Sequence, residues 1–170
     1  QLENIIGPVI QEAKNWGNIP VIAAGGIWDK KDIDKFLGFG CIGVQMATRF
    51  IGTFECDADA KFKNVLLNAK AEDIQLMKSP VGLPARGVMT NLQFSIENKT
   101  APKVQCISNC VAPCNRGHEA KIVGYCIADR LGAAYQGDTE TGLFFSGSNG
   151  YRIDKIISVK ELIEKLTIGE

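Results

Sequence analysis

Two short segments hold the residues whose types and spacing could bind an anion. Residues 20–27 read PVIAAGGI and residues 43–50 read GVQMATRF, so each is a short apolar run that ends in small or polar residues. A glycine turn lets a ligand come close to the backbone, and successive N–H groups at a strand end converge on an anion. Together the two segments predict a phosphate-binding site.

The side chains of the second segment would complement the glycines of the first. Taken alone, Gly25 and Gly26 fit either a phosphate contact or a turn that needs only the geometry of glycine. Gln45 adds an amide, Thr48 adds a hydroxyl that can donate to a phosphate oxygen, and Ala47 is small enough to leave the backbone accessible. The candidate cofactor-binding residues are Gly25, Gly26, Gln45, Met46, Ala47 and Thr48.

The elements around these segments follow the order helix, strand, helix, strand. Residues 1–17 have helical apolar spacing, residues 19–24 are a continuous apolar run typical of a buried parallel strand, and residues 41–46 resemble them. Asp29 is placed to cap a helix that ends at Gly38. Phosphate commonly binds at the last two strand ends of an eight-stranded βα barrel, and two such units cannot close one. We therefore expect an α/β chain that is the C-terminal portion of a (β/α)8 TIM barrel and a piece of a longer polypeptide.

The remaining residues predict a helical, cysteine-containing extension. Residues 1–56 would then be the last two βα units of the barrel, and residues 57–170 the extension that packs on it. Asp57 is expected to cap a helix over 58–70, and two prolines and a glycine in 79–86 predict a fixed extended loop. Further along we expect a helix near 119–136, a loop over 142–150 and a final helix opened by a capping box at 158–161.

The motifs are specific enough to resemble a known family. AAGGI followed by GVQMATRF, then SPVGLPAR at 79–86 and GSNGYR at 147–152, is similar to the nitronate monooxygenases, formerly 2-nitropropane dioxygenases. The resemblance implies a flavin barrel whose FMN phosphate is held by the glycine pair and by a Gln-Met-Gly-Thr segment, here residues 45–48. Ala47 departs from the family's glycine, and only a negative φ at this position would leave the site unstrained.

The resemblance also implies what this chain lacks. The family's catalytic base is a histidine upstream of this segment, whereas His118, the only histidine, does not match that motif. We therefore assign no catalytic residue and expect no turnover by this chain alone. The intact protein would be a flavin-dependent monooxygenase that oxidises alkyl nitronates with oxygen. Its barrel would be completed by the missing N-terminal half or by a homodimer. The alternatives are an NAD(P)H-dependent enoyl-acyl-carrier-protein reductase of the same fold and a non-catalytic phosphate- or metal-binding module.

A cysteine-rich stretch admits several interpretations. It contains Cys106, Cys110, Cys114, His118 and Cys126. Cysteine sets of this kind hold zinc or iron–sulfur clusters, but the spacing is not the usual close pair and Pro113 argues against one regular helix. A disulfide or thiols that act as small apolar residues are the alternatives, and we assign no metal ligand.

Other polar residues leave two possibilities open. Arg49 either adds charge to the phosphate site or points into solvent, and Arg86 either contacts a ligand or forms a surface ion pair. Residues 147–150 could be a second anion-binding nest or an ordinary turn, with Tyr151 and Arg152 within reach of a ligand in the first case.

Composition excludes several classes of partner. The chain has 19 basic and 19 acidic residues, so no net charge favours nucleic acid or a membrane surface. No apolar run is long enough to cross a bilayer, and no signal peptide is visible. We therefore expect a cytoplasmic protein with a small-molecule substrate.

Overall fold

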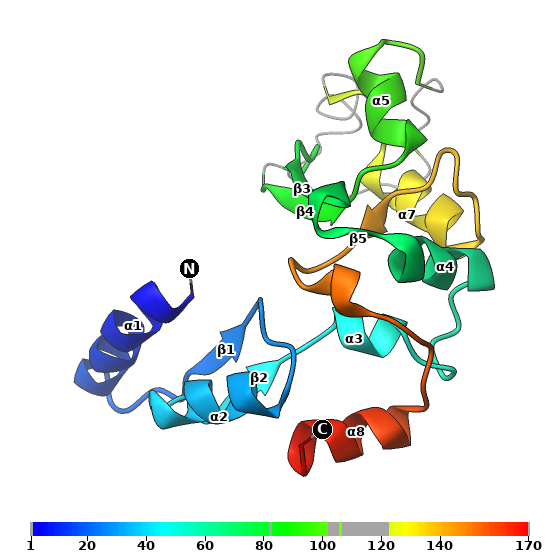
Figure 1. The fold of residues 1–170 in the computed structure, drawn as a ribbon. Coiled ribbons are helices and arrows are strands. Elements are labelled where there is room, and N and C mark those ends of the chain that lie inside the picture. Colours follow the sequence, from blue (N-terminus) through cyan, green and yellow to red (C-terminus); the bar gives the residue numbers. More distant parts are fainter. Residues whose placement is uncertain (1, 82, 102–105, 107–122, 170) are drawn as a thin grey trace. The chain divides into compact units, whose positions relative to one another are not determined.

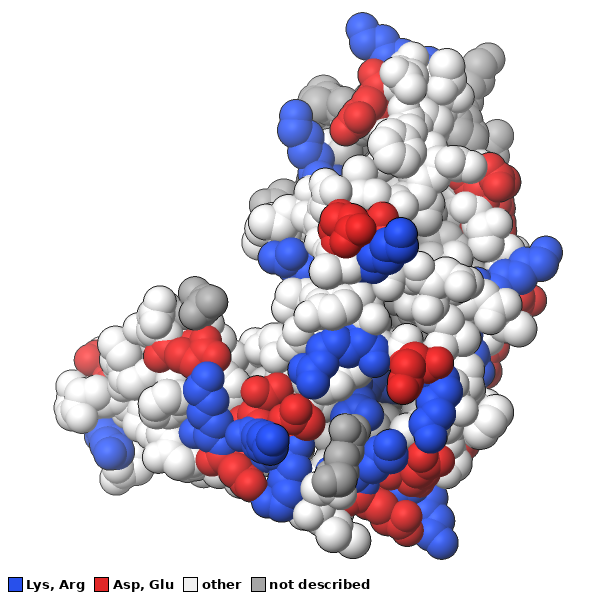
Figure 2. Space-filling model, viewed as in Figure 1, with Lys and Arg blue, Asp and Glu red and all other residues white. Residues whose placement is uncertain are grey.

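The computed structural model describes residues 2–81, 83–101, 106 and 123–169 of the chain (Figure 1). These residues form two compact units. The first consists of Gln1–Cys56 together with Ile156–Glu170, and the second of Asp57–Lys155. Basic and acidic side chains are intermixed over the face of the molecule drawn in Figure 2. No helix among the described residues has the length and apolar character needed to cross a membrane.

The first unit is built around two parallel strands. Its elements are α1 (Glu3–Asn15), β1 (Ile22–Ala24), α2 (Lys30–Gly38), β2 (Gly43–Gln45), α3 (Thr48–Ile51) and α8 (Val159–Thr167). Helix α2 connects β1 to β2 and packs on the pair, as the predicted strand–helix–strand order requires (Figure 1). Both strands are shorter than predicted, because ladder hydrogen bonds form only where the two backbones run beside each other.

The core of the first unit lies on one face of these strands. Ile6 and Ile10 lie one helical turn apart on α1 and are buried with Ala23 of β1 and Phe36 of α2. The predicted cap of α2 is confirmed, since the Asp29 carboxylate accepts a hydrogen bond from the backbone N–H of residue 32 at 3.0 Å. Local capping and helical apolar spacing together therefore account for this layer.

Helix α8 belongs to the first unit. Its predicted capping residue is confirmed, because the Ser158 hydroxyl accepts a hydrogen bond from the N–H of Glu161 at 3.0 Å. Leu162 and Leu166 are buried and pack toward Ile33 of α2. The second compact unit therefore ends at Lys155, whereas the expected extension continued to residue 170. The apolar stripe of α8 pairs with helices more than 100 residues earlier in the chain, a contact that local sequence does not specify.

The second unit contains an antiparallel sheet that the sequence interpretation missed. Among its described residues the elements are α4 (Ala60–Asn68), η1 (Ala71–Asp73), β3 (Ile74–Met77), β4 (Ala85–Val88), α5 (Asn91–Glu97), α7 (Ile127–Tyr135), β5 (Phe144–Phe145) and η3 (Gly150–Arg152). The sheet order is β3-β4-β5, with both pairs antiparallel. The extension is therefore not only helix and loop. The expected loop over 79–86 is partly the connection between β3 and β4, and its last two residues begin β4.

Two helix starts also differ from the prediction. Helix α4 is capped by Asp59, whose carboxylate accepts from the N–H of Lys61 at 2.8 Å, whereas Asp57 accepts a hydrogen bond from the hydroxyl of Tyr135 at 3.1 Å. Where a helix was expected over 119–136, the described residues form α7 only from Ile127. Gly124 has a φ of +99°, outside the helical region, and so interrupts the pattern.

The core of the second unit is closely packed against its sheet. Leu92, Leu143 and Phe144 are almost fully buried, and the rings of Phe62 and Phe144 lie 4.9 Å apart. A Cβ atom on Gly87 of β4 would lie only 2.3 Å from the Phe144 carbonyl oxygen. This position therefore needs glycine because β5 approaches so closely.

Candidate functional site

The glycine turn, Gly25 and Gly26, follows directly after β1. Their φ angles are +104° and +73°, conformations that side-chain-bearing residues rarely adopt. Both residues are exposed, and a Cβ built on either would meet no other atom within 4 Å. The turn therefore needs glycine for its backbone conformation, and it faces open space rather than the packed core.

The parallel register brings the second segment to the same end of the ladder. Ala24 pairs with Gln45, so the glycine turn and residues 46–48 leave neighbouring strands side by side. The Gln45 side chain is exposed and Thr48 is half-buried at the start of α3. The fold thus brings together the two segments that contain the predicted site residues.

Ala47 takes the place of a family glycine without strain. Its φ is −128°, outside the left-handed region that favours glycine. The backbone conformation at this position therefore does not require glycine.

Arg49 joins the two segments, a role that sequence reasoning did not identify. Its Nη1 donates a hydrogen bond to the Trp28 carbonyl oxygen at 2.8 Å, and its guanidinium carbon lies 4.7 Å from the centre of the Trp28 ring. The backbone N–H of Trp28 in turn donates to the Asp32 carboxylate at 2.8 Å. Trp28 is only 5% exposed. No local motif pairs these residues, because 21 positions separate Arg49 from Trp28.

An apolar groove lies in the same unit. Its volume is about 760 Å³, and its lining comes from both strands and from helices α2, α3 and α8. Gln45 and Met46 line it together with Ile22, Val44, Phe50 and Leu166. Two candidate site residues therefore border an apolar space large enough for a small organic molecule.

The candidate ligand contacts of the second unit are Arg86 and the loop over residues 147–150. They lie beside each other but do not form an open anion-binding turn. The backbone N–H of Ser146 donates to the Arg86 carbonyl oxygen at 3.2 Å, which brings β4 beside the loop over 147–150. A Cβ on Gly150 would lie 1.9 Å from the Ser146 hydroxyl oxygen. That glycine is therefore closed against its own loop, while Tyr151 and Arg152 are exposed.

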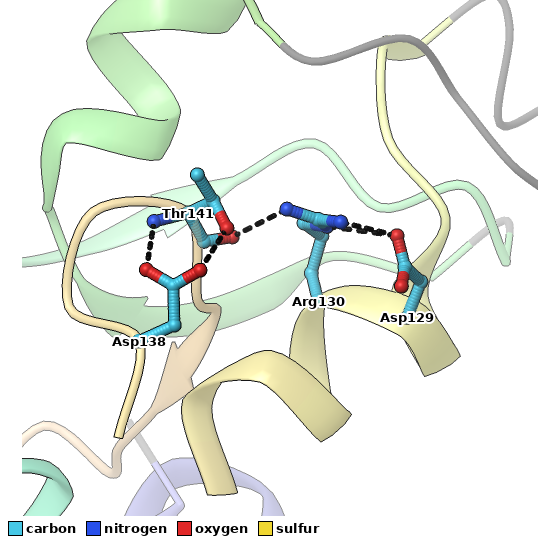
Figure 3. Close-up of polar contacts among 4 residues, drawn as sticks. All are labelled: Asp129, Arg130, Asp138 and Thr141. Atoms are coloured by element: carbon cyan, nitrogen blue, oxygen red, sulfur yellow. Dashed lines mark hydrogen bonds and ion pairs between the residues drawn. The ribbon is translucent and has the colours of Figure 1, made fainter. Parts of the chain in front are cut away.

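The loop after α7 is fixed by its own polar contacts (Figure 3). Asp138 accepts hydrogen bonds from the hydroxyl and the N–H of Thr141, and these bonds hold the pKa of its carboxyl group below the ordinary value. Arg130 donates to the Thr141 carbonyl oxygen at 3.3 Å and pairs with the Asp129 carboxylate. These groups satisfy one another and serve the loop itself.

The cysteine cluster is only partly described. Cys110, Cys114 and His118 lie outside the described residues, while Cys106 is exposed and Cys126 is a buried free thiol. Within the part of the chain that the structure describes, no three potential ligands gather around one point.

Comparison with known proteins gives one consistent family. The sequence pattern of the nitronate monooxygenase family matches residues 2–169. A probable nitronate monooxygenase of Staphylococcus saprophyticus is 34% identical over 90 residues, which are 52% of this chain and 25% of that protein. The (3aS,4S,5R,7aS)-5-hydroxy-7a-methyl-1-oxo-octahydro-1H-indene-4-carboxyl-CoA dehydrogenase of Rhodococcus jostii is 35% identical over 81 residues, 48% of this chain and 23% of that protein.

A solved structure is similar over nearly the whole chain. FabK from Thermotoga maritima superposes with a TM-score of 0.71 at 27% identity, covering 96% of this chain and 48% of that one. This chain therefore spans about half of that solved chain and matches about a quarter of the curated relatives. With nearly every residue inside the matched pattern, the chain belongs to the nitronate monooxygenase family of flavin oxidoreductases.

Proposed function

We propose that this chain supplies the FMN phosphate site of a longer TIM-barrel oxidoreductase that oxidises alkyl nitronates with oxygen. The observation that carries the proposal is the parallel register of β1 and β2. It places an open glycine turn beside Gln45 and the segment that ends in Thr48. Family membership supplies the reason to expect FMN rather than another phosphate compound.

The residues present fit a phosphate group. The glycine turn faces open space, so an anion can approach its backbone. Gln45 contributes an exposed amide and Thr48 a hydroxyl, and both groups can donate to phosphate oxygens. FMN, when bound, supplies the redox chemistry. The role of this chain is to hold and orient the phosphate end.

The proton-transfer step belongs to another part of the protein. The described residues offer no histidine beside the candidate phosphate site, and the family resemblance implies an upstream histidine as base. We place residues 1–56 at the C-terminal end of the barrel, with the remaining strands in the half that this chain does not match. The chain alone is then expected to be inactive.

The β1–β2 pair leaves room for those strands. Ala23 of β1 is fully buried beneath the helices, whereas Ile22, which points to the opposite face, is 58% exposed. An exposed apolar strand face is buried when other elements pack over it, whereas an exposed strand edge pairs with a further strand. The missing barrel half or a second copy of the chain would supply both.

The visible absorption spectrum of the purified intact protein tests the proposed function. A flavin band that bleaches when a nitronate is added without oxygen supports it. If no flavin binds even after reconstitution with FMN, the glycine turn and residues 45–48 are not its phosphate site. Flavin binding without nitronate oxidation would limit the proposal to the cofactor.

A second candidate is an NAD(P)H-dependent reductase that acts on an unsaturated thioester. The Rhodococcus relative is named as a dehydrogenase of a carboxyl-CoA compound, which supports a thioester as the substrate class but not the direction of the reaction. In that case the flavin band bleaches with NAD(P)H and not with a nitronate. A non-catalytic module that binds metal or phosphate would instead show bound zinc or iron and no flavin.

A further inference from the structure

The glycine turn is held from both ends. On the upstream side the β1–β2 ladder fixes Ala24 against Gln45. On the downstream side the Trp28 N–H is bound by Asp32 and its carbonyl oxygen by Arg49. Two adjacent glycines have more backbone freedom than any other pair, so their conformation depends on how firmly the flanking residues are fixed.

Arg49 has the geometry of a clamp rather than of a phosphate ligand. Its Nη1 donates to the Trp28 carbonyl oxygen, and its guanidinium carbon lies over the Trp28 ring. A guanidinium holds its N–H donors in one rigid plane, so it can lie over a ring and donate in a fixed direction, whereas the ammonium group of lysine is a compact charge on a flexible stem that fixes no such geometry. Because Arg49 directly follows Thr48, the same residue ties the second site segment to the first.

We propose that Arg49 is a positioning residue for the phosphate site: it holds the glycine turn through Trp28 and does not neutralise the phosphate itself. The inference rests on the proposed function, because it assumes that the glycine turn binds the phosphate of FMN. It goes beyond that function by assigning the conformation of the turn to one side chain outside the binding set.

The test compares FMN with riboflavin in the intact protein. The two ligands differ only in the phosphate, so the ratio of their dissociation constants reports the phosphate site alone. Arg49→Lys keeps the positive charge but loses the planar guanidinium group. Arg49→Met keeps much of the side-chain length but loses the charge as well. For a clamp, both substitutions weaken FMN binding by roughly tenfold to a hundredfold, the range for one lost charge-assisted hydrogen bond. Riboflavin affinity stays within about twofold of the parent value, well below the tenfold change that one such bond carries.

A matched control comes from the second unit. Arg130→Lys makes the same substitution at an arginine that also donates to a backbone carbonyl, in the loop drawn in Figure 3. It should lower stability but leave the FMN-to-riboflavin ratio unchanged. Riboflavin binding also checks that each Arg49 variant is folded.

The outcomes separate the two proposals. If Arg49→Lys binds FMN like the parent protein while Arg49→Met does not, Arg49 acts as a charge and the clamp is wrong. If both variants keep the parent ratio, Arg49 has no role in the site, although the phosphate site stands. If the parent protein itself does not prefer FMN to riboflavin, the proposed function fails and the inference fails with it.

Discussion

One glycine pair in the first unit and one glycine in the second serve opposite purposes. In the first unit, Gly25 and Gly26 have positive φ angles, and a Cβ on either would meet nothing within 4 Å. In the second unit, Gly142 has no unusual φ, but a Cβ there would lie 2.3 Å from the Asp138 carbonyl oxygen. The first pair keeps a backbone open in a conformation that only glycine adopts readily. The second allows a loop to close on a helix. Glycine content alone therefore does not identify a binding loop.

The largest effect on stability is expected in the closed loop. Gly142→Ala would force a methyl group against the backbone of Asp138 and of Ala134, neither of which can rotate away. We expect a loss of about 3 kcal/mol in the free energy of unfolding, measured by denaturant titration of the intact protein.

Gly132→Ala is the control for this prediction. Gly132 lies in α7 with nothing within 4 Å of its Cβ position, so the change should stabilise the helix by about 0.5–1 kcal/mol. Equal effects of the two substitutions would show that the loop is not closely packed.

A substitution in the glycine turn should affect mainly ligand binding. Gly25→Ala costs about 1–2 kcal/mol in backbone strain at positive φ. It should also abolish the preference for FMN over riboflavin, because the turn must move to relieve the strain. Equilibrium titration with both flavins measures this.

Gly17→Ala provides the comparison for the open turn. Gly17 also has a positive φ of +96° and open space around it, but it lies at the end of α1. The two variants should lose similar stability, and only Gly25→Ala should lose phosphate recognition. If Gly17→Ala also lost phosphate recognition, the effect would come from backbone strain in general and not from the glycine turn.

Tyr125 tests how well the second unit satisfies its buried polar groups. Its hydroxyl donates to the Lys78 carbonyl oxygen at 2.6 Å, and Tyr125→Phe should cost about 1–2 kcal/mol. Burial raises the pKa of Tyr125 to about 12. A folded pKa above the ordinary value of 10 gives stability that is complete below pH 10 and is lost as the pH rises toward 12. Unfolding titrations across this window should show a slope that the phenylalanine variant lacks.

The smallest effect is expected at the loop drawn in Figure 3. Hydrogen bonds from Thr141 lower the pKa of Asp138 in the folded protein. Its contribution to stability is therefore present above the ordinary carboxyl pKa and is lost as the pH falls through the lowered value. Asp138→Asn should flatten the acid side of the stability profile and change little at neutral pH. An unchanged acid profile would mean that the Thr141 hydrogen bonds do not favour the ionised carboxylate.

Local signals in the sequence were sufficient for the caps and for the order of the elements around the glycine turn in the first unit. Asp29 and Ser158 cap helices as predicted, because a cap depends only on residues three positions apart. The order of strands and helices around the glycine turn also follows from short-range apolar spacing. Sequence reasoning was weaker in the second unit, where Asp59 rather than Asp57 caps α4 and three short strands form one sheet. Strands of two to four residues are too short for a periodic pattern to identify them.

The sequence by itself determined the two candidate phosphate segments, the helices with strong caps and the family resemblance, since each depends on neighbouring residue types. Only the tertiary structure decided that α8 packs with the first unit, that Gly142 closes a loop, and that Arg49 lies on Trp28. Those outcomes depend on contacts between residues far apart in the chain. Such contacts form only when whole elements pack, because no local pattern encodes which distant surface will bury a given side chain.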